Sequence, residues 1–403
     1  MRTIKILVTG GGTGGHVSPA LAVIQTLQGM ALGQDWTPEF RYVGSRQGVE
    51  QGLVEAAGIP FVGVQSGKLR RAASLRGLLT IKNLADAFRV PVGIKEAIGE
   101  VRRFRPDVVL ATGGYVSVPP VIAAGLLRRP VLIHEQTVQV GLANRIAARF
   151  ATRIALTFEG AASDLPPKLR AKTFVTGNPV RSAIFGGDRA QAIVLCDFDA
   201  ADDALPAVYV TGGALGAQSI NRAVEAALPD LLTFCRVIHQ CGKQDGEHME
   251  QVRAGLAPAE QRRYYVVPFV GAEIADFFAL ADLVVGRSGA GTVTEVAALG
   301  KPALFIPLVP TGGDEQTRNA RRSADAGAAI ILPSGELTGP RLLSEIRALL
   351  GDMVRLKAMG TAALTLATPD AAYALARALL EMAGLPPAQA PGVGHVPPRI
   401  GYN

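Results

Sequence analysis

A glycine-rich stretch near the N-terminus, Val8 to Val23 (VTGGGTGGHVSPALAV), carries the residue types best suited to chemistry. A short β-prone run, Ile4 to Val8, precedes the glycines, and a helical pattern follows them from Pro19. Glycine lets backbone N–H groups approach an oxyanion closely, and a helix start adds partial positive charge there. The stretch therefore predicts a phosphate-binding turn between a parallel strand and a helix.

His16 lies at the mouth of this turn. Its imidazole is suited to act as a general base toward a substrate hydroxyl, although it could instead only cap the turn. The spacing Gly10-x-Gly12-x-x-Gly15 also fits the dinucleotide fingerprint, which expects an acid at the end of the second strand. This chain has Arg46 there, which suits a 2'-phosphate, so an NADP-dependent oxidoreductase stays open as an alternative.

Composition limits the fold class. The 403 residues are enough for two domains, and 48% hydrophobic content with only 5% aromatic residues predicts an aliphatic core of parallel strands covered by helices. The three cysteines have no paired CxxC spacing, which is typical of reduced thiols in a cytosolic protein. The N-terminal apolar run is better used as a strand than as a signal peptide, and charges interrupt the best membrane-span candidate, so we expect a soluble or peripheral protein.

The segment from Lys68 to Arg105 is strongly basic. It holds ten Lys and Arg residues against three acids, an excess equal to the formal net charge of +7, and leucines are interleaved with the charges. Such a segment suits an anionic membrane surface. A solvated helix face is the plainer alternative. No recognised nucleic-acid motif accompanies the segment, so we expect no nucleic-acid partner.

Two further strands lead into polar loops. The strand Val108–Ala111 precedes Gly113, Gly114 and Tyr115, and the strand Val131–Ile133 precedes His134, Glu135 and Gln136. Because ligands bind outside the carboxyl ends of parallel strands, these loops and the first turn are expected to face one cleft. His134 and Glu135 could form an acid/base pair, or Glu135 could bond backbone N–H groups of the following loop.

The first turn recurs once. Residues 209–224 (YVTGGALGAQSINRAV) match it at an offset of 202 residues, with Gln218 in the place of His16. A single recurrence predicts two similar Rossmann-like halves with a cleft between them.

The second half contains a sharper βαβ pattern, Asp282 to Pro307. Its strand-to-helix turn, Ser288 to Thr292, offers N–H donors to a diphosphate. Glu295 is placed in the first helical turn, either to hold ribose hydroxyls or only as a helix-end charge. Gln316 and Asn319 lie at another helix start and are suited to bind a sugar.

Three other stretches complete the sequence predictions. Asp197-Phe198-Asp199 spells a DxD metal motif but lies in an acidic connection, so we interpret it as a solvated loop. Thr368-Pro369 predicts a helix start, with Thr368 as N-cap, and the helix continues to Met382. The proline-rich tail, residues 385–403, is predicted to be disordered.

An ordered set of motifs over roughly residues 4–383 resembles the MurG family of GT-B glycosyltransferases. The set is GGGTGGHVSPALA, ATGGYVS, HEQ...GLANR, GNPVR, GGALGAQSIN, RSGAGTVTE and DEQTRNA. The resemblance implies an α/β fold of two Rossmann-like domains facing a central cleft. It also implies inverting transfer of N-acetylglucosamine from UDP-N-acetylglucosamine to the lipid-linked muramyl pentapeptide, lipid I, at the cytoplasmic face of the cell membrane, without metal or other cofactor.

The domains implied are residues 1–177, which take the lipid acceptor and receive residues 368–384 as a returning helix, and residues 178–367, which take the UDP-sugar. His16 is the implied base, with Glu135 as the alternative. Implied acceptor-binding residues are Gly12, Gly113, Gly114, Tyr115, His134 and Gln136. Implied donor-binding residues are Thr13, Gly14, Gly15, Thr137, Arg181, Ala214, Ser288, Gly289, Ala290, Gly291, Thr292, Glu295, Gln316 and Asn319.

Three positions depart from the family pattern. Thr137 stands where asparagine is usual, Ala214 where serine is frequent, and Glu315 where His or Gln is usual. A related enzyme that glycosylates another lipid or a secondary metabolite is therefore an alternative, and a UDP-sugar epimerase that shares the two-domain plan is another.

Overall fold

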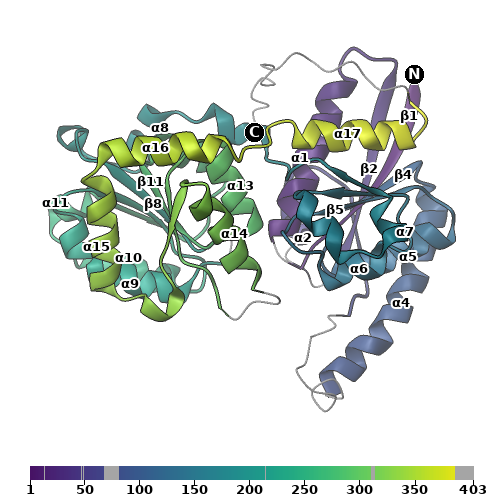
Figure 1. The fold of residues 1–403 in the computed structure, drawn as a ribbon, viewed down its shortest axis with the longest axis horizontal. Helices are drawn as coiled ribbons and strands as arrows, with labels where there is room; N and C mark the ends of the chain where they lie inside the picture. The colour runs from purple at the N-terminus through teal and green to yellow at the C-terminus, as the bar shows by residue number, and fades with distance from the viewer. Residues whose placement is uncertain are drawn as a thin grey trace. The chain divides into compact units, whose positions relative to one another are not determined.

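The computed structural model describes residues 1–12, 14–46, 48, 50–67, 81–213, 215–309 and 314–385. These residues form two compact α/β units, one from Met1–Arg181 with the segment that begins at Thr368, the other from Ser182–Ala367 (Figure 1). The first unit holds a seven-stranded sheet of order β3-β2-β1-β4-β5-β6-β7, and the second a six-stranded sheet of order β10-β9-β8-β11-β12-β13. The α/β class predicted from composition and from the repeated turn is confirmed.

The first unit alternates strands and helices along the chain. Its strands are β1 (Arg2–Thr9), β2 (Trp36–Ser45), β3 (Phe61–Val64), β4 (Val108–Ala111), β5 (Val131–Glu135), β6 (Arg153–Leu156) and β7 (Thr173–Val175). Its α-helices are α1 (Gly14–Ala31), α2 (Glu50–Ala56), α4 (Ile81–Phe104), α5 (Val118–Leu126), α6 (Leu142–Ala147), α7 (Pro167–Arg170) and α17 (Ala371–Met382). All strand pairs are parallel, so their carboxyl ends meet at one edge.

Both faces of this sheet are buried, as alternation along the strands requires. Ile6 and Val8 of β1 face the core that is completed by α1 and α17, whereas Leu7 between them faces the core that is completed by α4, α5 and α6. This double coverage explains why the central strand β4 (VVLA) is apolar without interruption and buried along its whole length. The parallel pairing of β1, β4 and β5 brings the loops that follow them to the same edge.

The C-terminal helix α17 belongs to the first unit. It packs against α1 (Figure 1) and contributes Leu375 and Leu379 to the core. The Arg2 guanidinium donates to the Ala383 carbonyl at 2.8 Å, and Arg153 pairs with Glu381 at 3.1 Å. The last described helix is therefore tied to strands at the beginning and the middle of the unit.

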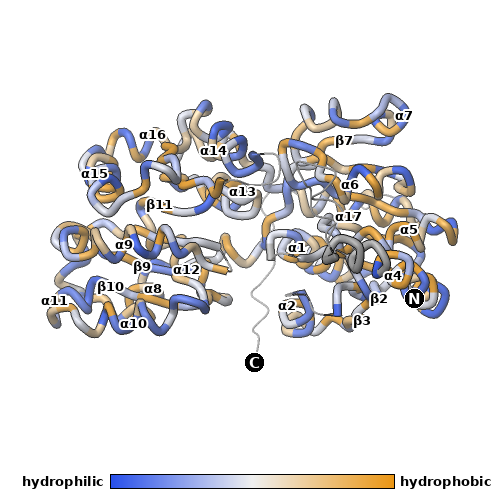
Figure 2. The backbone as a smooth tube through the Cα atoms, turned by 90° about the horizontal axis from the view of Figure 1, so that it is seen from below, coloured by the Kyte–Doolittle hydropathy of each residue, from blue (hydrophilic) through white to orange (hydrophobic). Residues whose placement is uncertain are grey.

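The second unit repeats the plan. Its strands are β8 (Ala207–Thr211), β9 (Arg236–Gln240), β10 (Tyr264–Val267), β11 (Leu283–Gly286), β12 (Ala303–Phe305) and β13 (Ala329–Ile331). Its α-helices are α8 (Arg189–Leu195), α9 (Gln218–Leu231), α10 (Gly246–Ala254), α11 (Pro258–Gln261), α12 (Ile274–Leu280), α13 (Ala290–Ala298), α14 (Glu315–Asp325), α15 (Gly339–Leu350) and α16 (Met353–Leu364). In Figure 2, β11 is coloured hydrophobic and α14 largely hydrophilic, as a buried strand and a surface helix should be.

The two recurring turns occupy equivalent places in the two sheets. The first follows β1, which lies between β2 and β4, and the second follows β8, which lies between β9 and β11. In each sheet this is the point where the strand order reverses, and ligands of open parallel sheets bind at that point.

Two helix starts differ from the sequence predictions. The helix predicted from Pro19 begins at Gly14, so the proline lies inside it and donates no N–H to the Gly15 carbonyl. The last helix begins at Ala371 with Asp370 at its N-cap, rather than with Thr368 as the cap. Thr368 instead packs against Gly177, where an added Cβ would lie 2.2 Å from the threonine Oγ1.

Two other predictions fall partly outside the described residues. The basic segment is described only from α4 onward, so residues 68–80 are not part of the structural account. Of the tail, only Leu385 is described, and it packs against the core that α17 completes. Among the described helices, none has both the length and the apolar character needed to cross a bilayer.

Candidate active site

His16 lies over the loop that follows β4. Its Nδ1 is 3.1 Å from the carbonyl oxygen of Thr112, and the Thr112 hydroxyl donates to the His16 carbonyl oxygen at 2.7 Å. Because a carbonyl only accepts, Nδ1 carries the proton and Nε2 keeps its lone pair. The half-buried ring also has its pKa lowered by burial. His16 is therefore a neutral imidazole with a basic nitrogen held in a fixed orientation, as a general base requires.

Glycines make the close packing around His16 possible. Gly113 and Gly114 have φ values of 96° and 80°, and Gly12 has a φ of 85°. A Cβ on Gly114 would lie 2.0 Å from the carbonyl oxygen of Gly11, and one on Gly12 would lie 2.6 Å from the Tyr115 ring. The loops after β1 and β4 are thus in backbone contact. Four predicted acceptor-binding residues are brought together beside the base: Gly12, Gly113, Gly114 and Tyr115.

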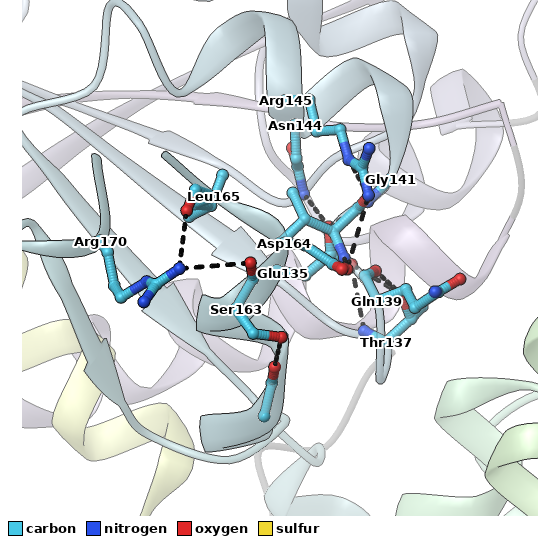
Figure 3. Close-up of polar contacts among 12 residues, drawn as sticks. Glu135, Thr137, Gln139, Gly141, Asn144, Arg145, Ser163, Asp164, Leu165 and Arg170 are labelled. Carbon is cyan, nitrogen blue, oxygen red and sulfur yellow. Dashed lines mark hydrogen bonds and ion pairs between the residues drawn. The ribbon is translucent and has the colours of Figure 1, made fainter. Parts of the chain in front are cut away.

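Glu135, the alternative base, is buried and fully engaged (Figure 3). Its Oε1 accepts the Thr137 N–H at 3.1 Å and the Thr137 hydroxyl at 3.0 Å, and its Oε2 accepts the Gly141 N–H and the Asn144 Nδ2, both at 2.9 Å. Burial raises the pKa of this carboxyl, and the four hydrogen bonds oppose that rise. The geometry gives Glu135 the second of its predicted roles, the organisation of the loop before α6.

His134 and Gln136 are buried on either side of Glu135. The Nε2 of His134 donates to the Gly177 carbonyl at 2.9 Å, and burial lowers the pKa of His134 to about 4. Gln136 donates its Nε2 to Thr112 at 2.8 Å. Both predicted acceptor-binding side chains therefore hold backbone segments of the site in place.

Sequence reasoning missed three groups of this site. The Thr112 carbonyl cannot be identified from a side-chain pattern, because any residue supplies one. Asn144 lies in the quoted GLANR motif but had no assigned role, although it is buried beside Glu135 and Gly113. Glu50 was overlooked, although its carboxylate accepts the N–H of Gly12 at 3.2 Å.

The residues behind the NADP alternative are engaged elsewhere. Arg46 donates from its guanidinium to Glu96 at 2.7 Å and to the Gly63 carbonyl at 3.3 Å. The Glu50 carboxylate also places negative charge beside the first glycine turn, where a dinucleotide would bring its diphosphate. The geometry therefore disfavours that alternative.

In the second unit, the start of α13 has the character of an anion site. Gly289 is the N-cap, with φ −64° and ψ 153°, and no side chain caps the first turn. A Cβ built on Gly289 or Gly291 would meet no atom of the described chain within 4 Å, so no described residue crowds this helix start at the two glycines. Unpaired N–H groups and the helix dipole together suit a diphosphate.

Side chains near this turn connect it to α14. Ser288 is fully buried and donates its hydroxyl to the Gln316 carbonyl at 2.8 Å, while Asn319 donates its Nδ2 to the Ser288 carbonyl at 3.1 Å. The Gln316 Oε1 accepts the Leu308 N–H at 2.9 Å. Glu295 is the sixth residue of α13, so its placement in the first helical turn was wrong, because the helix already begins at Ala290.

The remaining predicted donor residues are placed as follows. Gly14 and Gly15 are the first two residues of α1, and Thr137 is bound to Glu135. Arg181 is half-buried, and its Nε has no hydrogen-bond partner among the described residues. Thr13 and Ala214 lie outside the described residues.

The DxD stretch packs as part of the second unit. Phe198 is buried in the core, and nearby Asp202 pairs with Arg263 at 2.6 Å, which lowers the pKa of the aspartate mainly through that hydrogen bond. Within the described ranges, no three His, Cys, Asp or Glu side chains are grouped as a metal site would need.

Two Rossmann-like units, one with a fixed basic imidazole and one whose helix start has no side-chain cap, are the plan of the GT-B fold class. Residues 6–156 match the glycosyltransferase family 28 N-terminal domain, and residues 207–375 match the glycosyltransferase family 28 C-terminal domain. The chain belongs to glycosyltransferase family 28.

Individual relatives agree with this family. The chain is 38% identical to a Bacillus cereus protein named UDP-N-acetylglucosamine--N-acetylmuramyl-(pentapeptide) pyrophosphoryl-undecaprenol N-acetylglucosamine transferase 2, over 86% of this chain and 91% of the relative. The crystal structure of Acinetobacter baumannii MurG superposes with a TM-score of 0.67 at 29% identity, covering 94% of this chain and 99% of that one. A UDP-GlcNAc 2-epimerase from Neisseria meningitidis, with a TM-score of 0.62 at 13% identity over 94% of this chain and 100% of that one, shares the fold alone.

Replacing His16 with alanine tests the proposed base. We expect His16→Ala to lower kcat by about 10²- to 10⁴-fold, the usual contribution of a positioned general base. UDP affinity, measured by calorimetry, should stay near that of the wild type, because the second unit is untouched. Loss of UDP binding in this variant would contradict the assignment.

The pH profile gives an independent check on His16. The base works unprotonated, and burial lowers its pKa below the ordinary 6.5. The acid limb of kcat/KM should therefore lie below pH 6.5, with activity falling as the pH drops through the lowered pKa. A limb centred well above pH 6.5 would show that another group limits the reaction.

Gly289→Val tests the anion site on α13. Its side chain would meet no described protein atom but would add bulk at the helix start, so Tm should fall only slightly, as expected for a poorer N-cap residue, while the UDP dissociation constant rises by roughly 10- to 100-fold, the value of a lost charge-assisted hydrogen bond. Gly29→Val, at an equally open position on α1, is the matched control and should leave UDP binding intact. Equal UDP affinities in the two variants would place the diphosphate elsewhere.

Proposed function

We propose that this protein transfers N-acetylglucosamine from UDP-N-acetylglucosamine to the muramyl hydroxyl of lipid I, forming lipid II for peptidoglycan synthesis. Membership in glycosyltransferase family 28 and the names of the relatives support this substrate pair. The observation that carries the chemistry is the His16 ring, whose Nδ1 is bound to Thr112 and whose Nε2 keeps its lone pair. An alcohol nucleophile needs such a base.

The proposed step is a single inverting displacement. The acceptor oxygen forms a bond to the anomeric carbon, its proton passes to His16 Nε2, and the bond between that carbon and the UDP oxygen breaks. UDP leaves with the bonding electrons. The N–H groups at the start of α13 and the Arg181 guanidinium stabilise the negative charge that develops on the diphosphate, so the proposed step needs no metal.

In this proposal the first unit receives the acceptor and the second unit receives the donor. Thr13 to Gly15, Thr137 and Ala214 add donor contacts, Glu295 holds the uridine ribose, and Gln316 with Asn319 faces the sugar. The backbone of Gly113 and Gly114 with the Tyr115 ring lines the acceptor side. The Thr137, Ala214 and Glu315 departures concern substrate identity rather than this division of roles.

The protein is further proposed to act at the cytoplasmic face of the membrane, as a peripheral enzyme. An acceptor with a long lipid tail stays in the bilayer, so the enzyme must approach the surface. The excess of basic residues between Lys68 and Arg105 supplies the charge for contact with anionic lipid, at about 1 kcal/mol per basic group near the surface.

The decisive experiment follows the label from UDP-N-acetylglucosamine to a lipid I analogue, with UDP release measured in parallel and no metal added. Label in the disaccharide product, formed with chelator present, is the expected result. UDP binding without transfer to that acceptor would overturn the substrate assignment and favour the related enzyme with another acceptor. Release of a free epimerised sugar nucleotide would favour the epimerase alternative.

Charge reversal tests the membrane contact. Replacing Arg70, Arg71 and Arg76 with glutamate should weaken co-sedimentation with anionic vesicles at low salt, because each reversal turns attraction into repulsion. Reversing Arg341, Arg355 and Lys357, three exposed residues of the second unit, makes the same change of charge and is the control. Equal sedimentation of the two triple variants would show that the basic segment does not bind the membrane and would favour the solvated helix face.

A further inference from the structure

Glu50 is a fully buried carboxylate next to the first glycine turn. It is the first residue of α2, a position where the helix N-terminus favours negative charge. Its Oε1 accepts the Ser45 N–H at 2.7 Å, and its Oε2 accepts the Gly12 N–H at 3.2 Å. One side chain therefore connects the end of β2 to the turn after β1.

The space for this carboxylate is made by glycines. A Cβ on Gly11 would lie 2.6 Å from the Glu50 carboxyl carbon, one on Gly44 would lie 2.9 Å from its Cγ, and one on Gly48 would lie 2.1 Å from its Oε1. Real Cβ atoms do not approach other atoms so closely. Gly11 of the first turn, Gly44 of β2 and Gly48 thus accommodate an anion that belongs to the chain itself.

The position of this carboxylate bears on the base. The Gly12 N–H is held by Glu50, and the Gly11 N–H donates to the Gly113 carbonyl at 3.3 Å, so both N–H groups of this half of the turn are used within the protein. Gly12 also packs on the Tyr115 ring. Because His16 follows only four residues later, the path of the turn sets where the imidazole meets Thr112.

We propose that Glu50 is a positioning residue for His16, and that it reserves the Gly11–Gly12 half of the first turn for its own carboxylate instead of a substrate phosphate. The proposal rests on the proposed function for its kinetic consequences, but the contacts of Glu50 do not depend on that function. A substrate diphosphate at Gly12 would have to displace a buried carboxylate and would meet its charge.

Removing and restoring the carboxylate tests this role. In Glu50→Ala, we expect kcat for transfer to fall on the order of 10- to 100-fold, as a misplaced base would cause, while the UDP dissociation constant stays within about twofold of the wild type. Added acetate fits the vacated space and should restore part of the lost rate, whereas chloride at equal ionic strength should not. Glu55→Ala, an exposed acid on the same helix bonded to Gln51, is the matched control and should keep the wild-type rate.

Glu50→Gln keeps the volume and one acceptor oxygen, so it decides the question if Glu50→Ala does not fold. Its amide nitrogen must face the N–H of Gly12 or of Ser45, so kcat should fall and acetate should have no effect. Three results with a folded Glu50→Ala would overturn the proposal. They are a wild-type kcat, a lowered kcat that acetate does not restore, and a loss of UDP affinity as large as the loss of kcat. If Glu50→Ala does not fold, a wild-type kcat in Glu50→Gln would overturn the proposal.

A readout without catalysis separates this proposal from the proposed function. The ring ¹⁵N shifts of His16 report whether Nδ1–H remains bound to Thr112. They should change in Glu50→Ala and return with acetate. If the wild type transferred no sugar to lipid I analogues while these shifts behaved as expected, the substrate assignment would fail and the positioning role would stand. Unchanged shifts in Glu50→Ala would overturn the positioning role.

Discussion

The carbonyl oxygen of Thr112 accepts two side-chain hydrogen bonds, and the geometry of the N-terminal site depends on it. His16 Nδ1 approaches at 3.1 Å and Gln136 Nε2 at 2.8 Å, so both lone pairs of the oxygen are used. Thr112 itself continues the β1–β4 pairing, because its N–H donates to the Thr9 carbonyl at 2.9 Å. The register of the sheet thus fixes the orientation of the base, and with it the nitrogen that keeps a lone pair.

The buried polar groups around this carbonyl form a support for the site. Glu135 accepts four hydrogen bonds, and His134 holds the Gly177 backbone. A buried polar group that loses its partner costs about 1 to 3 kcal/mol, so each contact strongly favours one loop conformation. A base must lie within hydrogen-bond reach of its proton, and such a rigid support provides that precision. Glu135 can therefore support the site as a fixed acceptor of hydrogen bonds, without ever exchanging a proton with substrate.

The sequence was informative wherever a local pattern determines the structure, and weaker where the partners come from distant segments. β4 has the predicted bounds, Val108–Ala111, because a short β-branched run between turn residues is unambiguous. The start of α1 was missed because glycines beside Pro19 indicate a loop, although five residues before the proline are helical. His16 was identified by its type and place in a motif. The role of Glu50 could not be, because Gly12 lies 38 residues away and only the β1–β2 pairing joins them. The three glycines around its carboxylate were the available signal.

Two strand-turn-helix units, one after β1 and the other after β11, serve two chemical needs. In the first unit, Glu50 and the Gly113 carbonyl occupy N–H groups of the turn after β1, and a carboxylate there opposes a second anion. In the second unit, no described side chain caps the start of α13, and a Cβ on Gly289 would meet no described atom within 4 Å. A nucleophilic hydroxyl needs a base to accept its proton, and the turn after β1, whose anion site is already filled by Glu50, offers it nothing more. A leaving diphosphate instead needs N–H donors that are not already bound. A strand-turn-helix unit therefore supplies a positioned base after β1, where its glycines close on an internal acid, and an anion site after β11, where its helix start has no side-chain cap.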